Sequence, residues 1–256
     1  MKNKCFIIII TTIILISIFY LSAYSNIPMG VFNRVLFVRY NNHFGSAFTI
    51  EIEDQQYIIT ARHIANNINE KDKISIYYNS KWQEINVTSL LFDDPNFDVL
   101  VLLPNTQVTP KTNVKFSMGG LILSQDVYFL GFPHGLAGDI GDLDYDYPLP
   151  FIKKGICSLI DFSEKDFVKI WIDGLSNPGF SGGPIVFKDL SDGVYKIAGV
   201  LKGYLNENIK VYSRINTTQI EESDYYIKAN SGIILGISID SVIKRITELI
   251  EKENDM

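Results

Sequence analysis

The chain has 256 residues, a formal net charge of −6 and a hydrophobic fraction of 46%, with 20% charged residues. This is the balance of a globular protein, and the length allows one large domain or two small ones that share a core. The acidic net charge and the lack of a basic cluster argue against a nucleic-acid partner. Ordinary glycine and proline contents exclude a fibrous or disordered chain.

The first 26 residues have the features of a leader. Lys2 and Lys4 precede an uncharged apolar run over residues 6–23, and the next charge along the chain is Arg34. Basic residues before an apolar run are typical of export signals, and the length of this run lies between that of a signal-peptide core and that of a spanning helix. We therefore expect an N-terminal apolar helix that is either cleaved or retained as a membrane anchor, with the rest of the chain outside the cytoplasm.

The two cysteines are Cys5, in the leader, and Cys157. The exported part therefore contains one thiol and no internal disulfide. Cys157 lies in the alternating segment GICSLI, which predicts a small buried hydrophobic side chain in a strand.

Beyond the leader, the sequence consists mainly of short segments rich in β-branched and aromatic residues, separated by polar turns. This pattern predicts an all-β protein with two groups of about six strands each, packed as two antiparallel barrels or sandwiches. The first group is expected at residues 31–40, 44–52, 56–60, 73–78, 81–91 and 97–104. After a connection near 105–122, the second group is expected at residues 126–133, 151–160, 167–173, 183–187, 195–203 and 232–238.

Helical periodicity is strong only near the C-terminus, where it predicts a helix over about residues 239–252 with Asp240 or Ser241 as its N-cap. Its apolar face is expected to contain Val242, Ile243, Ile246, Leu249 and Ile250. The long polar tract 206–231 is compatible with an extended hairpin or with a mobile loop.

The segment NPGFSGGPIV, residues 177–186, surrounds one serine with glycine and proline. A serine that performs acyl transfer needs a base, a group that orients the base, and N–H donors for the oxyanion. Glycine permits backbone conformations that direct N–H groups inward. We therefore expect Ser181 to be the nucleophile, with the N–H groups of Gly179 and Ser181 forming the oxyanion hole.

The candidate base is His63, because it follows the buried strand IIT at the point where a short helical turn begins. The other histidines, His43 and His134, lie in polar turns. The candidate orienting group is Asp98, which precedes a strongly apolar strand, whereas Asp93 and Asp94 lie in a turn that we expect to be solvated.

The candidate base and carboxylate fall in the first strand group and the serine in the second, so the site is expected at the seam between two barrels. TARHIA around His63, FDVLVL around Asp98 and NPGFSGGP around Ser181 resemble the trypsin-like serine peptidases of the chymotrypsin fold. The bacterial branch with the HtrA proteases and glutamyl endopeptidases is the most similar. GSAF (45–48), GFP (131–133) and AGVLKG (198–203) add to the resemblance, which covers about residues 31–245.

This resemblance implies one protease domain over residues 27–256, with a first barrel at about 31–104 and a second at about 123–238. It implies a serine endopeptidase that acts on proteins or peptides through an acyl-enzyme, without a cofactor or a metal. No PDZ domain is expected after the helix. The sequence leaves the oligomeric state open, and the alternative function is a catalytically silent module of the same fold that binds peptides.

The resemblance also assigns residues to substrate specificity. Leu175, Ser176, Gly199, Leu201 and Lys202 are expected to form the substrate-binding pocket. No acid is present among them to bind Lys or Arg, so we expect an uncharged P1 residue, while Lys202 leaves an acidic P1 residue open.

Two residues depart from the family pattern. Arg62 replaces a small residue, so its charge is expected to point outward or to meet an acid. Phe180 replaces the Asp or Asn that usually precedes the serine, so activation through an ion pair with a newly cut N-terminus is not expected.

The acidic loop 138–150 suggests a calcium site by the spacing of its acids, but it lacks the EF-hand glycine and has Lys153 where the closing glutamate belongs. We therefore expect a solvated loop. Its acids are Asp139, Asp142, Asp144 and Asp146.

Overall fold

The computed structural model describes residues 27–90, 92, 94–138, 146–215 and 220–254. The predicted leader, with its apolar run at 6–23, lies outside the described residues, and so do Asp93 and most of the acidic loop (Asp139, Asp142 and Asp144). Within the described ranges, no helix has the length and apolar character that a membrane crossing needs.

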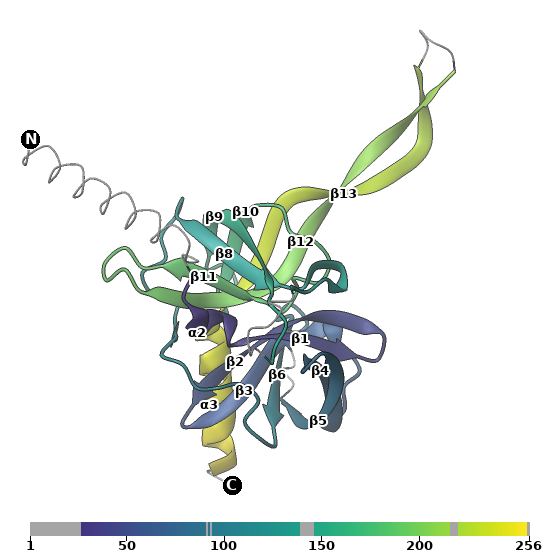
Figure 1. Ribbon diagram of the computed structural model, residues 1–256. Helices are drawn as coiled ribbons and strands as arrows, with labels where there is room; N and C mark the ends of the chain where they lie inside the picture. The colour runs from purple at the N-terminus through teal and green to yellow at the C-terminus, as the bar shows by residue number, and fades with distance from the viewer. Residues whose placement is uncertain (1–26, 91, 93, 139–145, 216–219, 255–256) are drawn as a thin grey trace, which may run out of the picture.

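The first six strands form a closed antiparallel barrel in the order β1-β2-β3-β6-β5-β4 (Figure 1). Its strands are β1 (Val35–Tyr40), β2 (His43–Ile52), β3 (Gln55–Ala61), β4 (Lys71–Tyr78), β5 (Lys81–Leu90) and β6 (Val99–Pro104). All six were expected from the sequence, with one difference at the start.

The predicted first strand begins too early, because Val31 and Phe32 lie in the short helix α2 (Met29–Phe32). Both side chains are buried. The backbone N–H groups of Asn33 and Arg34 donate to the Met29 and Val31 carbonyls, so local turn hydrogen bonds take the place of strand pairing there.

The second group of strands closes into a ring in the order β11-β8-β9-β10-β13-β12, through an additional pairing between β11 and β12. The two-residue strand β7 adds to β12 in parallel. The bounds are β7 (Lys115–Phe116), β8 (Asp126–Gly131), β9 (Phe151–Asp161), β10 (Lys169–Asp173), β11 (Pro184–Lys188), β12 (Tyr195–Arg214) and β13 (Ile220–Ser238). The predicted fold class of two packed six-stranded barrels with a C-terminal helix is thus confirmed for the described residues.

A continuous apolar core joins the two barrels. Phe37 of β1 stacks on Phe132, which follows β8, with ring centroids 4.8 Å apart, and Phe97 meets Phe167 edge to face at 5.4 Å. Cys157 is buried inside the second barrel, as predicted, and burial raises the pKa of its thiol.

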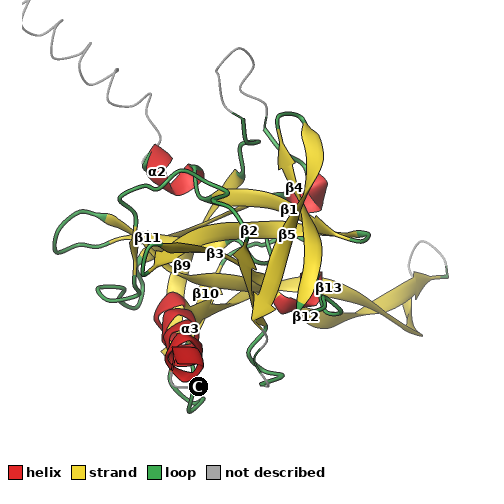
Figure 2. Ribbon diagram, turned by 90° about the horizontal axis from the view of Figure 1, so that it is seen from below, coloured by secondary structure: helices red, strands yellow, loops and turns green. Residues whose placement is uncertain are grey.

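The predicted C-terminal helix is present as α3 (Ile239–Asn254) (Figure 2). Its N-cap is Ser238, whose Oγ accepts a hydrogen bond from the backbone N–H of Asp240 at 3.2 Å. The predicted N-caps, Asp240 and Ser241, are wrong, because their side chains accept hydrogen bonds from backbone N–H groups of neighbouring loops. The predicted apolar face packs on the core through Val242, Ile243, Ile246, Leu249 and Ile250.

Strands β12 and β13 are much longer than the segments 195–203 and 232–238 predicted for them. They remain paired from Asn206 opposite Asn230 to Arg214 opposite Ile220. The described part of the tract 206–231 is therefore an extended hairpin, one of the two alternatives left open by the sequence. Figures 1 and 2 both show it projecting away from the two barrels.

Candidate active site

Strand pairing in the first barrel brings His63 and Asp98 together. Strand β3 ends at Ala61, which pairs with Val99 at the start of β6. Because the two strands are antiparallel, the residues just after β3 lie beside those just before β6. The backbone N–H of Arg62 then donates to the Asp98 carbonyl at 3.2 Å, and a 3-10 turn places the next residue, His63, at the rim of the barrel.

The Asp98 carboxylate binds His63 through both of its oxygens. Oδ2 lies 2.7 Å from His63 Nδ1, and Oδ1 accepts the backbone N–H of His63 at 3.0 Å. A carboxylate at this position favours the tautomer with a proton on Nδ1, which leaves Nε2 as a proton acceptor. The Asp98 side chain is 13% exposed and that of His63 is 45% exposed, so the carboxylate is sheltered while the imidazole is open to a ligand.

The loop that contains Ser181 requires glycine on both sides of the serine. Gly179 has φ +102°, and a Cβ there would lie 2.2 Å from the Phe132 carbonyl oxygen. Gly182 has φ +83°, and a Cβ there would lie 2.1 Å from the Ser46 carbonyl oxygen. Both positive φ values and both close approaches exclude larger side chains.

Ser46 of β2 holds this loop from the first barrel. Its Oγ donates to the Gly179 carbonyl at 2.6 Å and accepts the Phe132 N–H at 3.0 Å, and its backbone N–H donates to the Ser181 carbonyl at 3.0 Å. The serine loop of the second barrel is therefore fixed by the same barrel that carries His63 and Asp98.

Two backbone donors beside Ser181 are left unused. Among the described residues, neither the Gly179 N–H nor the Ser181 N–H has a hydrogen-bond acceptor, whereas the intervening Phe180 N–H donates to the Asn177 carbonyl at 3.3 Å. Unpaired N–H groups on both sides of a residue at a glycine-rich turn form a cradle for an oxygen that carries negative charge.

The three candidate catalytic residues line one pocket of 360 Å³ between the barrels. In the described structure, no hydrogen bond joins Ser181 Oγ to His63, a bond that commonly tightens only when substrate is bound. A Cβ on Gly203 would lie 3.9 Å from Ser181 Oγ, so this glycine faces the hydroxyl across the pocket. The lining consists of His63, Asp98, Pro178, Ser181, Lys202, Gly203, Tyr204, Leu205 and Leu235.

Of the five residues predicted to bind substrate, only Lys202 lines this pocket. Leu201 is fully buried in the core of the second barrel, and a Cβ on Gly199 would lie 2.4 Å from a backbone oxygen of β13, so neither presents a side chain to a substrate. Leu175 is 59% exposed outside the pocket, and Ser176 is buried. These four residues lie outside the lining of this pocket, and their assignment to substrate binding stays a prediction.

Five residues of the lining were not assigned to the pocket from the sequence, and two of them, Tyr204 and Leu205, lie beyond residue 203, where the predicted strand ended. The residues missed are Pro178, Gly203, Tyr204, Leu205 and Leu235. The available signal was the apolar and aromatic pair Tyr204-Leu205 directly after the AGVLKG segment.

The two departures from the family pattern have structural explanations. The guanidinium of the half-buried Arg62 donates to the Phe92 carbonyl at 2.9 Å and forms no ion pair with an acid among the described residues. Phe180 is fully buried and meets Phe129 edge to face at 5.2 Å, with the Lys153 ammonium 5.7 Å from its ring centroid. Apolar packing thus holds Phe180, the residue directly before the serine, in place.

A second cavity, of 560 Å³, adjoins His63 on the side of the first barrel. It is rich in amides and includes one of the two histidines assigned to polar turns. Its lining is Tyr40, Asn41, Asn42, His43, His63, Ile64, Asn66 and Asn67.

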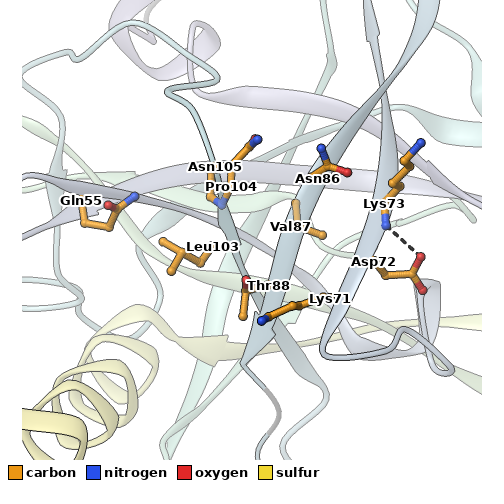
Figure 3. Close-up of a pocket in the computed structure, with 10 residues that line it drawn as sticks. All are labelled: Gln55, Lys71, Asp72, Lys73, Asn86, Val87, Thr88, Leu103, Pro104 and Asn105. Carbon is orange, nitrogen blue, oxygen red and sulfur yellow. Dashed lines mark hydrogen bonds between the residues drawn. The ribbon is translucent and has the colours of Figure 1, made fainter.

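A larger pocket, of 720 Å³, lies elsewhere, along β4, β5 and β6 of the first barrel (Figure 3). Its lining, which includes Lys71, Lys73 and Asn86, contains none of the candidate catalytic residues, so it is not part of this site. Within the described part of the chain, no cluster of three or more His, Cys, Asp or Glu side chains is placed to hold a metal ion.

No family model matches this chain, and no curated protein matches its sequence. Solved structures do match. The Rv3671c protease of M. tuberculosis H37Rv in its inactive form superimposes with a TM-score of 0.54 at 18% identity, over 86% of this chain and 90% of that one. The HtrA-type protease AlgW, crystallised with a tripeptide, gives a TM-score of 0.55 at 19% identity, over 87% of this chain and 62% of that one. At these identities the likeness concerns the fold, which is the two-barrel fold of trypsin-like serine proteases.

Proposed function

We propose that this chain is a serine endopeptidase that acts outside the cytoplasm, with Ser181 as nucleophile, His63 as general base and Asp98 as the group that orients the base. The observation that carries the proposal is the two-point hydrogen bonding of Asp98 to His63 at the pocket that also contains Ser181 and two unused backbone N–H groups. The basic and apolar leader supports the location outside the cytoplasm.

In the proposed mechanism, Ser181 Oγ attacks the scissile carbonyl while His63 Nε2 takes the hydroxyl proton. The imidazolium then gives this proton to the leaving amine, and an acyl-enzyme remains. A water molecule repeats the sequence and releases the acid. Asp98 remains ionised throughout and stabilises the imidazolium through Nδ1–H, so this chemistry needs neither a cofactor nor a metal.

The N–H groups of Gly179 and Ser181 stabilise the negative charge on the carbonyl oxygen in the tetrahedral intermediate. Because they have no internal acceptor in the described residues, no bond must be broken before they act. Removing one such donor from a serine protease costs roughly 10²–10³ in kcat.

We propose further that activity does not depend on cutting a new N-terminus. The residue that would bind such an N-terminus is the fully buried Phe180, which has no charge to offer. If a defined N-terminal trimming step proved necessary for activity on peptides, this part of the proposal would be wrong.

The pocket suggests the preferred P1 residue. Its lining beyond the catalytic residues is mainly apolar, with Lys202 as its one described cation, and its one described carboxylate, Asp98, is already bound to His63. We therefore propose that P1 is uncharged or acidic, and a peptide library cut strictly after Lys or Arg would contradict this.

The second candidate function is a catalytically silent module that holds a peptide in the same pocket. It is favoured only by the missing hydrogen bond between Ser181 and His63. A fluorophosphonate probe, which reacts with activated serines, separates the two functions. The enzyme is supported if wild-type protein is labelled, Ser181→Ala is not, and the exposed control Ser163→Ala is labelled like the wild type. Folded wild-type protein that resists labelling would support the silent module.

A further inference from the structure

The hairpin of β12 and β13 continues far beyond the barrel to which it belongs. Paired residues run from Asn206 opposite Asn230 to Arg214 opposite Ile220, which is roughly 30 Å of two-stranded ribbon at about 3.3 Å per residue. We call residues 206–214 and 220–230 the ribbon. A two-stranded ribbon that packs on nothing else is marginally stable in water, and a third strand stabilises such a structure.

One edge of the ribbon is unpaired and leads away from the catalytic serine. Up to Leu201 this edge of β12 is covered, because Gly182 N–H donates to the Leu201 carbonyl at 2.7 Å and Leu201 N–H donates to the Gly183 carbonyl at 2.9 Å. Beyond Leu201, the described strands that pair with β12 lie only on its other side, where β13 runs. The open edge of β12 therefore begins at Lys202, next to the point where Gly182, the residue after the serine, pairs with Leu201.

The same stretch of β12 forms one wall of the active-site pocket. Residues 202–205 line it together with His63 and Ser181. A peptide that adds to this edge in the antiparallel direction runs opposite to β12, so its C-terminal end lies at Ser181 and its N-terminal end points toward the ribbon tip. The residues upstream of the scissile bond would then follow the ribbon.

The ribbon has two chemically different faces. Residues directly opposite each other in an antiparallel pair share a face, so Ile209 and Ile227 lie together, with the pair Glu207 and Ala229 two residues further along the same face. Ile209 is 48% exposed and Ile227 is 59% exposed, although neither belongs to a core cluster. The opposite face is polar and contains Asn206, Asn208, Lys210, Lys228 and Asn230, with Tyr226 among them.

We propose that the ribbon is an extension of the substrate-binding edge and that it binds unfolded polypeptide upstream of the scissile bond by adding it as a third strand. This inference rests on the proposed protease function and names its substrate class: extended segments about nine residues long with an apolar side chain at every second position. Backbone hydrogen bonds supply the affinity, and the alternate apolar side chains that lie beside Ile209 of β12 supply the selectivity.

The test is a series of quenched fluorescent peptides that share one cleavage sequence and extend about three, six or nine residues upstream, compared in two proteins. One is the wild type. The other has residues 207–229 replaced by Asn-Gly, a dipeptide that closes two-residue hairpins. Asn230 is kept, because its side chain donates to the Ser176 carbonyl at 2.7 Å. Fluorophosphonate labelling of Ser181 shows independently that the shortened protein retains its active site.

For the wild type, kcat/KM should rise about tenfold from the shortest to the longest peptide, and the shortened protein should lose this rise. N-methylation of alternate upstream amides should remove it as well, since it blocks strand pairing. Ile209→Asn should reduce the preference for apolar side chains more than Lys210→Gln on the polar face.

A length-independent kcat/KM in wild-type protein that labels at Ser181 would overturn the ribbon proposal and leave the protease proposal intact, whereas failure to label would overturn the protease proposal itself. A dimer in solution that dissociates when the ribbon is shortened would assign the open edge to a second copy of the chain, and would likewise overturn the substrate proposal.

Discussion

Replacing Asp98 by asparagine isolates the role of one carboxylate oxygen. The backbone N–H of His63 donates to Oδ1, so the amide oxygen of the new side chain must occupy that position. The amide nitrogen then falls at the position of Oδ2, 2.7 Å from His63 Nδ1 in the wild type. Because the amide NH₂ donates, Nδ1 must accept, and the proton moves to Nε2. An Nε2 that carries a proton cannot take one from Ser181.

The expected loss is large because this substitution leaves the shape of the site intact and changes only the tautomer. A wrong tautomer in a triad of this kind costs about 10⁴ in kcat, equivalent to about 5.4 kcal/mol of transition-state stabilisation. The assays are kcat/KM on a peptide and the rate of fluorophosphonate labelling, with thermal unfolding to show that the variant is folded. The matched control is Asp126→Asn, which removes a carboxylate from an exposed ion pair with Lys154. An Asp98→Asn enzyme within about tenfold of the wild type would refute the assignment.

Three further predictions concern the surroundings of the site and the stability of the second barrel. Gly179→Ala should lower kcat by roughly 10²–10³, because strain at φ +102° and the close Phe132 carbonyl displace the oxyanion donor. Phe180→Ala should lower the free energy of unfolding in urea by about 3–5 kcal/mol, since the ring is fully buried. The hydrogen bond from Lys196 holds the pKa of Asp189 well below its usual range, so its stabilising effect is present above about pH 4 and is lost as pH falls further. Asp189→Asn should therefore flatten the acid side of the stability profile, measured as Tm against pH.

Each of these predictions has a matched control. Gly30→Ala adds a methyl group with only ordinary contacts, Phe162→Ala removes an exposed ring, and Asp54→Asn removes a carboxylate that is 97% exposed. Normal turnover by Gly179→Ala would remove that N–H from the proposed oxyanion hole. A Phe180→Ala protein as stable as Phe162→Ala would contradict the packing argument. Equal acid profiles for Asp189→Asn and the wild type would show that the Lys196 contact does not contribute.

The predicted elements that were right depend on short-range patterns. Alternating apolar residues predicted both groups of strands. His63 and Asp98 each adjoin one of these strands, and this was enough to predict that they lie near the serine loop at the seam between the barrels. The structure adds the reason, which is the pairing of Ala61 with Val99. That register is a long-range property, and no local pattern encodes it.

The errors arise where local patterns are ambiguous. A break in register between Leu201 and Gly203 changes which residues of β12 face the pocket, so Leu201 became a core residue and Gly203 a pocket residue. The N-cap was misplaced because Ser238, Asp240 and Ser241 are all capable of capping, and only the neighbouring loops decide which hydroxyl or carboxylate is free. The sequence did not decide between a hairpin and a loop for the ribbon, because its many polar residues show no clear alternation of apolar and polar side chains.

Ser46 links the timing of activity to the completion of the tertiary structure. Two of its three hydrogen bonds reach from a strand made early in synthesis to the turn around residues 179–181, which is made more than a hundred residues later, and the third accepts the N–H of Phe132. A partly synthesised or half-folded chain therefore contains every reactive side chain of the first barrel but no fixed cradle for an oxyanion. If the chain has the proposed protease function, hydrolytic capacity arises in one step, when the two barrels dock and the oxyanion cradle becomes fixed.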